Sequence, residues 1–154
     1  MIDRIRKWFN RPQAVSEEGK ALDHVQFCVA VLLVEIARAD FEQSDVEVAV
    51  IGQQLAARFD LSEEETANLL KAAQDKVEGS VSLHEFTKAL HSDMSYAEKE
   101  AVVEMLWRIA LADQNLDKYE DYMIGKIAEL LYVYRGDVIR LKDRVIQSIR
   151  QTGE

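Results

Sequence analysis

The sequence predicts an all-α fold of about seven helices, arranged as two pseudo-symmetric three-helix halves in one bundle. Three observations support this prediction. The chain has only one Pro and six Gly among 154 residues, so few residues interrupt helices. Its apolar residues recur at helical spacing rather than in alternation. A segment near residue 40 is repeated 73 residues later.

Composition restricts the class of protein. A chain that is 48% apolar and 31% charged is globular, and 154 residues suffice for one sizeable core. Cys28 is the one cysteine and lies in an apolar run, so we expect an inert buried thiol in a reducing compartment. No uninterrupted apolar run reaches about 18 residues and no signal peptide is evident, so we expect a cytoplasmic protein.

Residues 1–18 are expected to form an N-terminal tip and linker before a single domain at 19–154. Residues 1–12 place Ile2, Ile5, Trp8 and Phe9 near one face of a short amphipathic helix and carry a net charge of +3. One interpretation is weak peripheral contact with the inner face of the membrane. The other is docking on a groove of the domain itself or of a partner.

The remaining helices follow from apolar spacing and from their start signals. A nearly all-apolar segment predicts a central buried helix ending near Asp40. Ser62–Glu65, Ser82–Glu85 and Ser95–Glu98 each fit the capping box, in which Ser and Glu satisfy amides at a helix start. The expected helices are 22–39, 45–59, one following Ser62, 83–91, 96–112, 118–134 and 137–150.

The internal repeat aligns residues 33–55 with 106–128. Eight of these 23 columns are identical, where unrelated sequences would match at roughly one or two. We expect the halves to span about 22–76 and 96–150. Gly52 and Gly125 occupy equivalent mid-helix positions, which suggests a close approach of two helix backbones.

Each copy of the repeat also holds an Asp at the end of an apolar helix and a Glu seven residues later. Glu47 and Glu120 fit the third position of a capping box. Asp40 and Asp113 instead face the negative end of a helix dipole, which is unfavourable by roughly 0.3–1 kcal/mol. The start of the next helix, a basic side chain or a bound cation would compensate.

The second copy, "DQNLDKYE", resembles the opening of an EF-hand loop. The match then fails, because Lys118 replaces the loop glycine and Ile124 replaces the final Glu. A shorter carboxylate site for a divalent ion (Ca, Mg, Mn or Zn), a purely structural loop and an acidic patch for a partner all remain open. The candidate metal ligands are Asp40, Glu47, Asp113, Asn115, Asp117 and Glu120.

The segments "ARADFEQSDVEVAVI" and "ALADQNLDKYEDYMI" resemble the TerB-like (tellurite-resistance protein B-like) family over approximately residues 22–150. The resemblance implies an all-helical fold of two pseudo-symmetric halves and a role in stress response. It also implies metal binding at the acidic positions. Family members often have Gly directly after the Asp, whereas this chain has Phe41 and Gln114, so its loops are expected to close differently.

Several functions are disfavoured. The net charge of −9 argues against nucleic-acid binding. No catalytic motif is present, so we expect no enzymatic activity and no catalytic or cofactor-binding residues, and we expect His24, His84 and His91 at the surface. The leading hypothesis is a non-enzymatic interaction module that binds a partner protein. Its rivals are a divalent metal sensor or buffer and, third, a metal-dependent enzyme.

Overall fold

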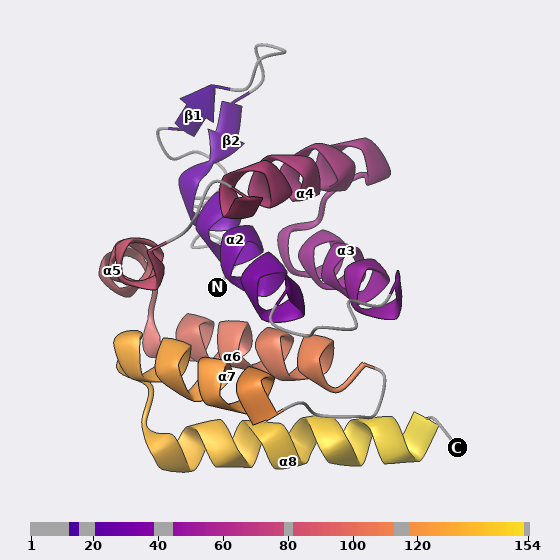
Figure 1. Cartoon of the computed structure of the whole chain (residues 1–154), viewed down its shortest axis with the longest axis vertical. Helices are drawn as coiled ribbons and strands as arrows, with labels where there is room; N and C mark the ends of the chain where they lie inside the picture. Colours follow the sequence, from indigo (N-terminus) through magenta and orange to yellow (C-terminus); the bar gives the residue numbers. More distant parts are fainter. Residues whose placement is uncertain (1–12, 16–20, 39–44, 79–81, 113–117, 153–154) are drawn as a thin grey trace.

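A computed structural model describes residues 13–15, 21–38, 45–78, 82–112 and 118–152 (Figure 1). These residues contain seven helices and two three-residue strands. The all-α fold predicted from the sequence is confirmed. No helix in the described part of the chain is long and apolar enough to cross a membrane.

The first half of the bundle is built around α2 (His24–Arg38), of which 11 of 15 residues are buried. A helix that is apolar on all sides requires cover on all sides. The helices α3 (Asp45–Phe59), α4 (Glu63–Glu78) and α5 (Leu83–Asp93) pack against α2, and so does α6 from the second half. Arg38 also donates a hydrogen bond of 2.8 Å to the carbonyl of Val77, which joins the ends of α2 and α4.

The second half contains α6 (Tyr96–Ala110), α7 (Lys118–Leu130) and α8 (Arg135–Thr152). In each half the first helix contacts the other two, and those two contact each other. Between the halves, α2 meets α6, α3 meets α6 and α2 meets α7. This set of contacts is unchanged when the halves are exchanged, as a duplicated unit requires. The pseudo-two-fold relation itself stays a prediction.

Helix starts agree with the predicted caps. The amides of Glu65 and Glu98 donate to the hydroxyls of Ser62 and Ser95, and each Glu carboxylate accepts from its serine amide in return. At α5 the Glu85 amide donates to the Ser82 hydroxyl over 3.4 Å. These bonds satisfy amides that a helix start leaves without partners.

The segment that precedes α2 contains a feature that the sequence did not indicate. Strand β1 (Gln13–Val15) pairs antiparallel with β2 (Ala21–Asp23), which leads directly into α2. Three-residue strands carry too little alternation to be recognised in a sequence. The amphipathic tip, residues 1–12, lies outside the described residues.

The interpretation of the paired glycines was wrong. A Cβ built on Gly52 would lie 3.8 Å from the Thr66 methyl group, an ordinary contact, and one on Gly125 would meet nothing within 4 Å. Neither position therefore requires glycine for close packing of backbones.

Glu35 is a half-buried carboxylate in the apolar helix α2. Its Oε1 atom is buried and has no hydrogen-bond partner among the described residues. Burial raises the pKa of Glu35 above its ordinary value of 4.5, and nearby Arg38 partly opposes the shift. The ionised side chain therefore opposes folding at neutral pH.

We expect Glu35→Gln to unfold at a higher temperature than the wild type at pH 7. A carboxyl with a raised pKa binds more protons in the folded chain, so its contribution to stability falls as pH rises from 4.5 through the folded pKa. The advantage of the variant should shrink as pH falls through the same interval. Denaturant unfolding between pH 3.5 and 7 measures the stability difference and its dependence on pH. Glu78→Gln is the control at an exposed position. A pH-independent difference would contradict the assignment to ionisation.

Candidate functional site

The predicted metal ligands lie mostly outside the described residues. Asp40, Asp113, Asn115 and Asp117 fall in the two loops that are not described. Glu47 is in the first turn of α3, where only the backbone is described. The geometry of the ligand set is therefore untested.

Glu120 is the one candidate ligand whose side chain is described. It lies in the first turn of α7 and is 0% exposed. Negative charge is favoured there, because the amides of the first turn form the positive end of the helix dipole. Its carboxylate oxygens are of the type that hard divalent ions take, so Glu120 fits both the capping and the metal interpretations.

No group of three or more His, Cys, Asp and Glu side chains suitable for a metal occurs among the described residues. His24, His84 and His91 are exposed, as predicted. Of these, His91 hydrogen-bonds the amine of Lys99 through Nδ1 and packs against the ring of Tyr132, with 4.5 Å between ring centroids.

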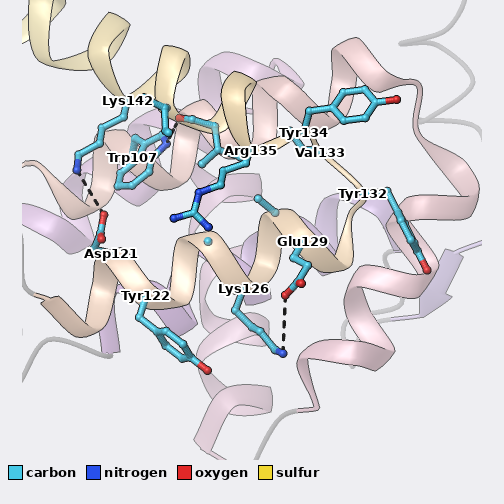
Figure 2. Close-up of a pocket in the computed structure, with 14 residues that line it drawn as sticks. Trp107, Asp121, Tyr122, Lys126, Glu129, Tyr132, Val133, Tyr134, Arg135 and Lys142 are labelled. Atoms are coloured by element: carbon cyan, nitrogen blue, oxygen red, sulfur yellow. Dashed lines mark hydrogen bonds and ion pairs between the residues drawn. The ribbon is translucent and has the colours of Figure 1, made fainter.

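A groove of about 970 Å³ lies between α7 and α8 (Figure 2). Trp107 of α6 lines it, only 3% exposed, and donates a hydrogen bond of 3.1 Å to the carbonyl of Val138. Gly125 lines the groove from α7, and the turn that joins α7 to α8 lines one end. A concave surface of this size accommodates a ligand or part of a partner.

Two ion pairs border the groove. Lys142 of α8 reaches Asp121 of α7 over 3.4 Å, and its amine lies 5.2 Å from the centre of the Trp107 ring. Lys126 and Glu129, one turn apart on α7, are 3.9 Å apart. Both pairs are drawn as dashed lines in Figure 2. Each charge in these pairs is balanced locally.

Exposed apolar side chains gather around this groove. All five large apolar side chains that are exposed in the described part of the chain lie between residues 119 and 139, each at least 52% exposed. They are Tyr119, Tyr122, Tyr132, Tyr134 and Ile139, and the last four line the groove. Scattered exposed apolar residues are ordinary, whereas exposed apolar side chains that line one groove make it a candidate interaction surface.

The equivalent place in the first half is closed. A shift of 73 residues relates Gly52 and Thr66 to Gly125 and Ile139. A Cβ built on Gly52 would lie 3.8 Å from the Thr66 methyl group, whereas one on Gly125 would enter open space. The helices α7 and α8 therefore leave a gap that α3 and α4 fill, so the groove is not simply inherited from the repeat.

Tyr132, at the end of the groove, adopts a left-handed backbone conformation with φ of 63°. Its position ends α7, where the Val133 amide donates to the Ala128 carbonyl over 2.9 Å. Glycine is the usual residue at such a helix end, and a bulky side chain there costs roughly 1–2 kcal/mol.

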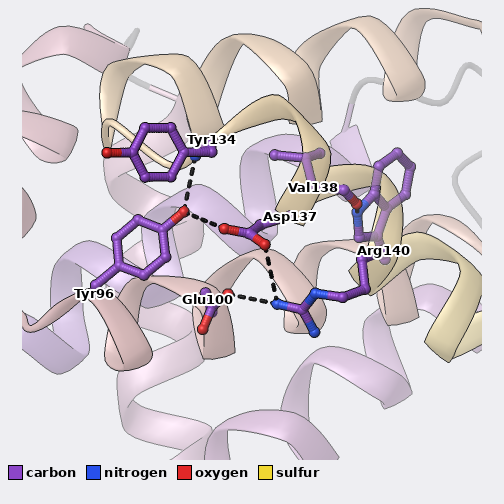
Figure 3. Close-up of polar contacts among 7 residues, drawn as sticks. Tyr96, Glu100, Tyr134, Asp137, Val138 and Arg140 are labelled. Atoms are coloured by element: carbon purple, nitrogen blue, oxygen red, sulfur yellow. Dashed lines mark hydrogen bonds and ion pairs between the residues drawn. The ribbon is translucent and has the colours of Figure 1, made fainter.

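A polar network holds the start of α8 against α6 (Figure 3). The Tyr96 hydroxyl donates to Asp137 over 2.6 Å and accepts from the Tyr134 amide over 2.9 Å. Arg140 donates to Glu100 over 2.6 Å and lies 3.4 Å from Asp137. Burial raises the pKa of Tyr96, and the bond to Asp137 raises it further, so the phenol stays protonated. This network fixes the α8 wall of the groove.

The fold and the groove together define a class of protein, a small helical domain with an aromatic-rimmed surface groove. The family model described as "Tellurite resistance protein TerB" matches residues 26–143. The chain belongs to this family, as its sequence motifs predicted. Searches of curated proteins and of solved structures each found no match.

The sequence did not predict the groove. Its exposed apolar side chains lie on α7, on the following turn and, with Ile139, on α8. Helical periodicity does not show that these segments meet beside a gap. A partial signal was present, because four of the five tyrosines of the chain fall between residues 119 and 134.

We expect Tyr96→Phe to lower the free energy of unfolding by about 1–2 kcal/mol, because it removes the donor to Asp137 and the acceptor of the Tyr134 amide. The melting temperature should fall by about 2–4 °C for each kcal/mol. Tyr122→Phe is the matched control, since no interaction of its hydroxyl is described. Equal melting temperatures for the two variants would contradict the role of the network.

Proposed function

We propose that this chain is a non-enzymatic interaction module of the TerB family that binds a partner protein in the groove between α7 and α8. One observation carries this proposal. The large apolar side chains that are exposed in the described part of the chain gather at the groove instead of being spread over the surface. Tyrosine is among the residues most enriched at the centres of protein interfaces.

The form of the groove also supports recognition of a macromolecule. Its rim is more than half exposed, its floor includes the buried Trp107, and the network around Tyr96 holds one wall in place. A rigid floor beneath accessible aromatic side chains is preorganised for binding and loses little conformational entropy when a partner arrives. By resemblance to its family, the module acts in a stress response related to tellurite resistance.

Two glycines offer a matched test of the groove. A Cβ at Gly125, which lines the groove, meets nothing within 4 Å, and the same holds for Gly136, which does not line it. We expect Gly125→Leu to fold at least as stably as the wild type, because Gly is unfavourable within a helix by about 1 kcal/mol. Its side chain should obstruct the groove, and Gly136→Leu should leave the groove open.

Affinity purification from the source cells, with quantitative mass spectrometry, compares the wild type with both variants. We expect at least one protein to be retained by the wild type and Gly136→Leu and lost by Gly125→Leu. Circular dichroism melts confirm that all three proteins are folded. If the same proteins are retained by all three, the groove is not the binding surface and the proposal fails.

Divalent metal binding at the acidic loops is the second candidate. It is favoured by Glu120, a fully buried carboxylate at the base of the 113–117 loop. Glu120 and side chains of residues 113–117 would bind the ion jointly. The positive charge of the ion would compensate Asp113, which the sequence places at the negative end of a helix dipole. In this role the protein senses or buffers the ion.

We expect Ca²⁺, Mg²⁺, Mn²⁺ or Zn²⁺ to raise the melting temperature if the loops hold metal. An ion at about 100 times its Kd stabilises the folded chain by about 2.7 kcal/mol. The double variant Asp40→Ala/Asp113→Ala should lose this response, and the control Asp75→Ala/Asp143→Ala should retain it. The absence of any shift at millimolar ion, measured by differential scanning fluorimetry, would exclude the metal candidate.

A further inference from the structure

The groove lies in a segment that is much less acidic than the segment before it. Residues 13–117 carry eight cations and 21 anions, a net charge of −13, whereas residues 118–152 carry seven cations and five anions, a net charge of +2. The charge near the groove, rather than the net charge of the whole chain, therefore determines which partners bind there. Opposite charge accelerates the approach of a partner, and like charge disfavours it.

Arg135 is the groove cation for which the described residues provide no ion pair. Lys142 is paired with Asp121, and Lys126 is paired with Glu129. Arg135 is exposed and has no ion pair within the described residues, and Figure 2 shows its guanidinium reaching from the start of α8 toward α7 across the groove. An arginine fork binds a carboxylate through two parallel hydrogen bonds.

From these observations we infer that the groove binds an acidic amphipathic helix of a partner protein, with a carboxylate on Arg135 and apolar side chains among the tyrosines. This inference rests on the proposed function and names the chemistry of the partner. A helix is favoured over an extended strand because the groove lies between two helices and offers no strand edge. Apolar residues at i, i+3, i+4 and i+7 would form the face that enters it.

Two other occupants fit less well. The N-terminal tip, residues 1–12, offers Trp8 and Phe9 but carries a net charge of +3, which Arg135 repels. A second copy of the chain offers exposed large apolar side chains, among the described residues, only from the groove region itself. That region is positive in both copies, so their charges oppose the contact.

The test is a selection from displayed random 15-residue peptides on the intact chain. Peptides that bind the wild type and Gly136→Leu but not Gly125→Leu are synthesised, and their affinities are measured by fluorescence anisotropy.

We expect the selected peptides to contain an excess of Asp and Glu, with apolar residues at helical spacing. Arg135→Glu should weaken binding by at least about tenfold, the loss that a charge-assisted hydrogen bond produces. Replacing the peptide carboxylates by Lys should restore affinity for Arg135→Glu.

Several results would overturn the inference. These are selected peptides that are basic or uncharged, an unchanged affinity for Arg135→Glu, or no peptide that depends on the open groove. Binding of a synthetic 1–12 peptide that Gly125→Leu abolishes would assign the groove to the tip. A dimer in analytical ultracentrifugation that is lost in Gly125→Leu would assign it to a second copy. The co-purification comparison is independent of peptide charge, so it separates failure of this inference from failure of the proposed function.

Discussion

The burial of α2 is the constraint on which the rest of the structure depends. Side chains such as Val29, Leu33 and Ile36 are completely removed from water, and full burial of one such side chain is worth about 1.5–3 kcal/mol. This free energy is obtained only if other helices cover α2 on every side. The surrounding helices α3, α4, α5 and α6 provide that cover, so the arrangement of the bundle follows from one apolar segment.

The second half repeats this arrangement without repeating its outer surface. Shifted by 73 residues, Leu69 of α4 becomes Lys142 of α8, and Thr66 becomes Ile139. Leu69 is buried, whereas Lys142 extends across Trp107 to Asp121. The buried Leu69 of the first half thus corresponds to Lys142 in the second half, whose ion pair with Asp121 borders the groove. Duplication accounts for the helices, and divergence on α7 and α8 accounts for the candidate site.

Sequence reasoning identified the elements because their causes are local. Apolar spacing and the Ser and Glu caps act within one or two turns, so α3, predicted at 45–59, is observed as Asp45–Phe59. Sequence reasoning failed for features that depend on how the helices pack together. Gly125 was interpreted as a close helix contact, yet its surroundings are set by the distance to α8, which no local pattern encodes. The groove was missed for the same reason.

The acidic positions show a different limit. The sequence predicts Glu120 as a cap or as a metal ligand, and its complete burial in the first turn of α7 is consistent with both roles. Burial of a carboxylate requires a compensating donor or cation, but it does not specify which one. The other candidate ligands of this copy, Asp113, Asn115 and Asp117, lie outside the described residues, and the chemistry of the site depends on such partners rather than on Glu120 alone.

A surface of tyrosines reconciles recognition with solubility. The rings of Tyr122, Tyr132 and Tyr134 present apolar area to a partner, while their hydroxyls remain hydrated in the free protein. Leucines at the same positions would form an apolar patch prone to association. In the proposed complex the charge of Arg135 would act in the same direction, because a cation without an ion pair among the described residues would stay hydrated until a partner carboxylate binds it. Under the proposed function, these side chains would suit a reversible, charge-selective contact better than a permanently buried one.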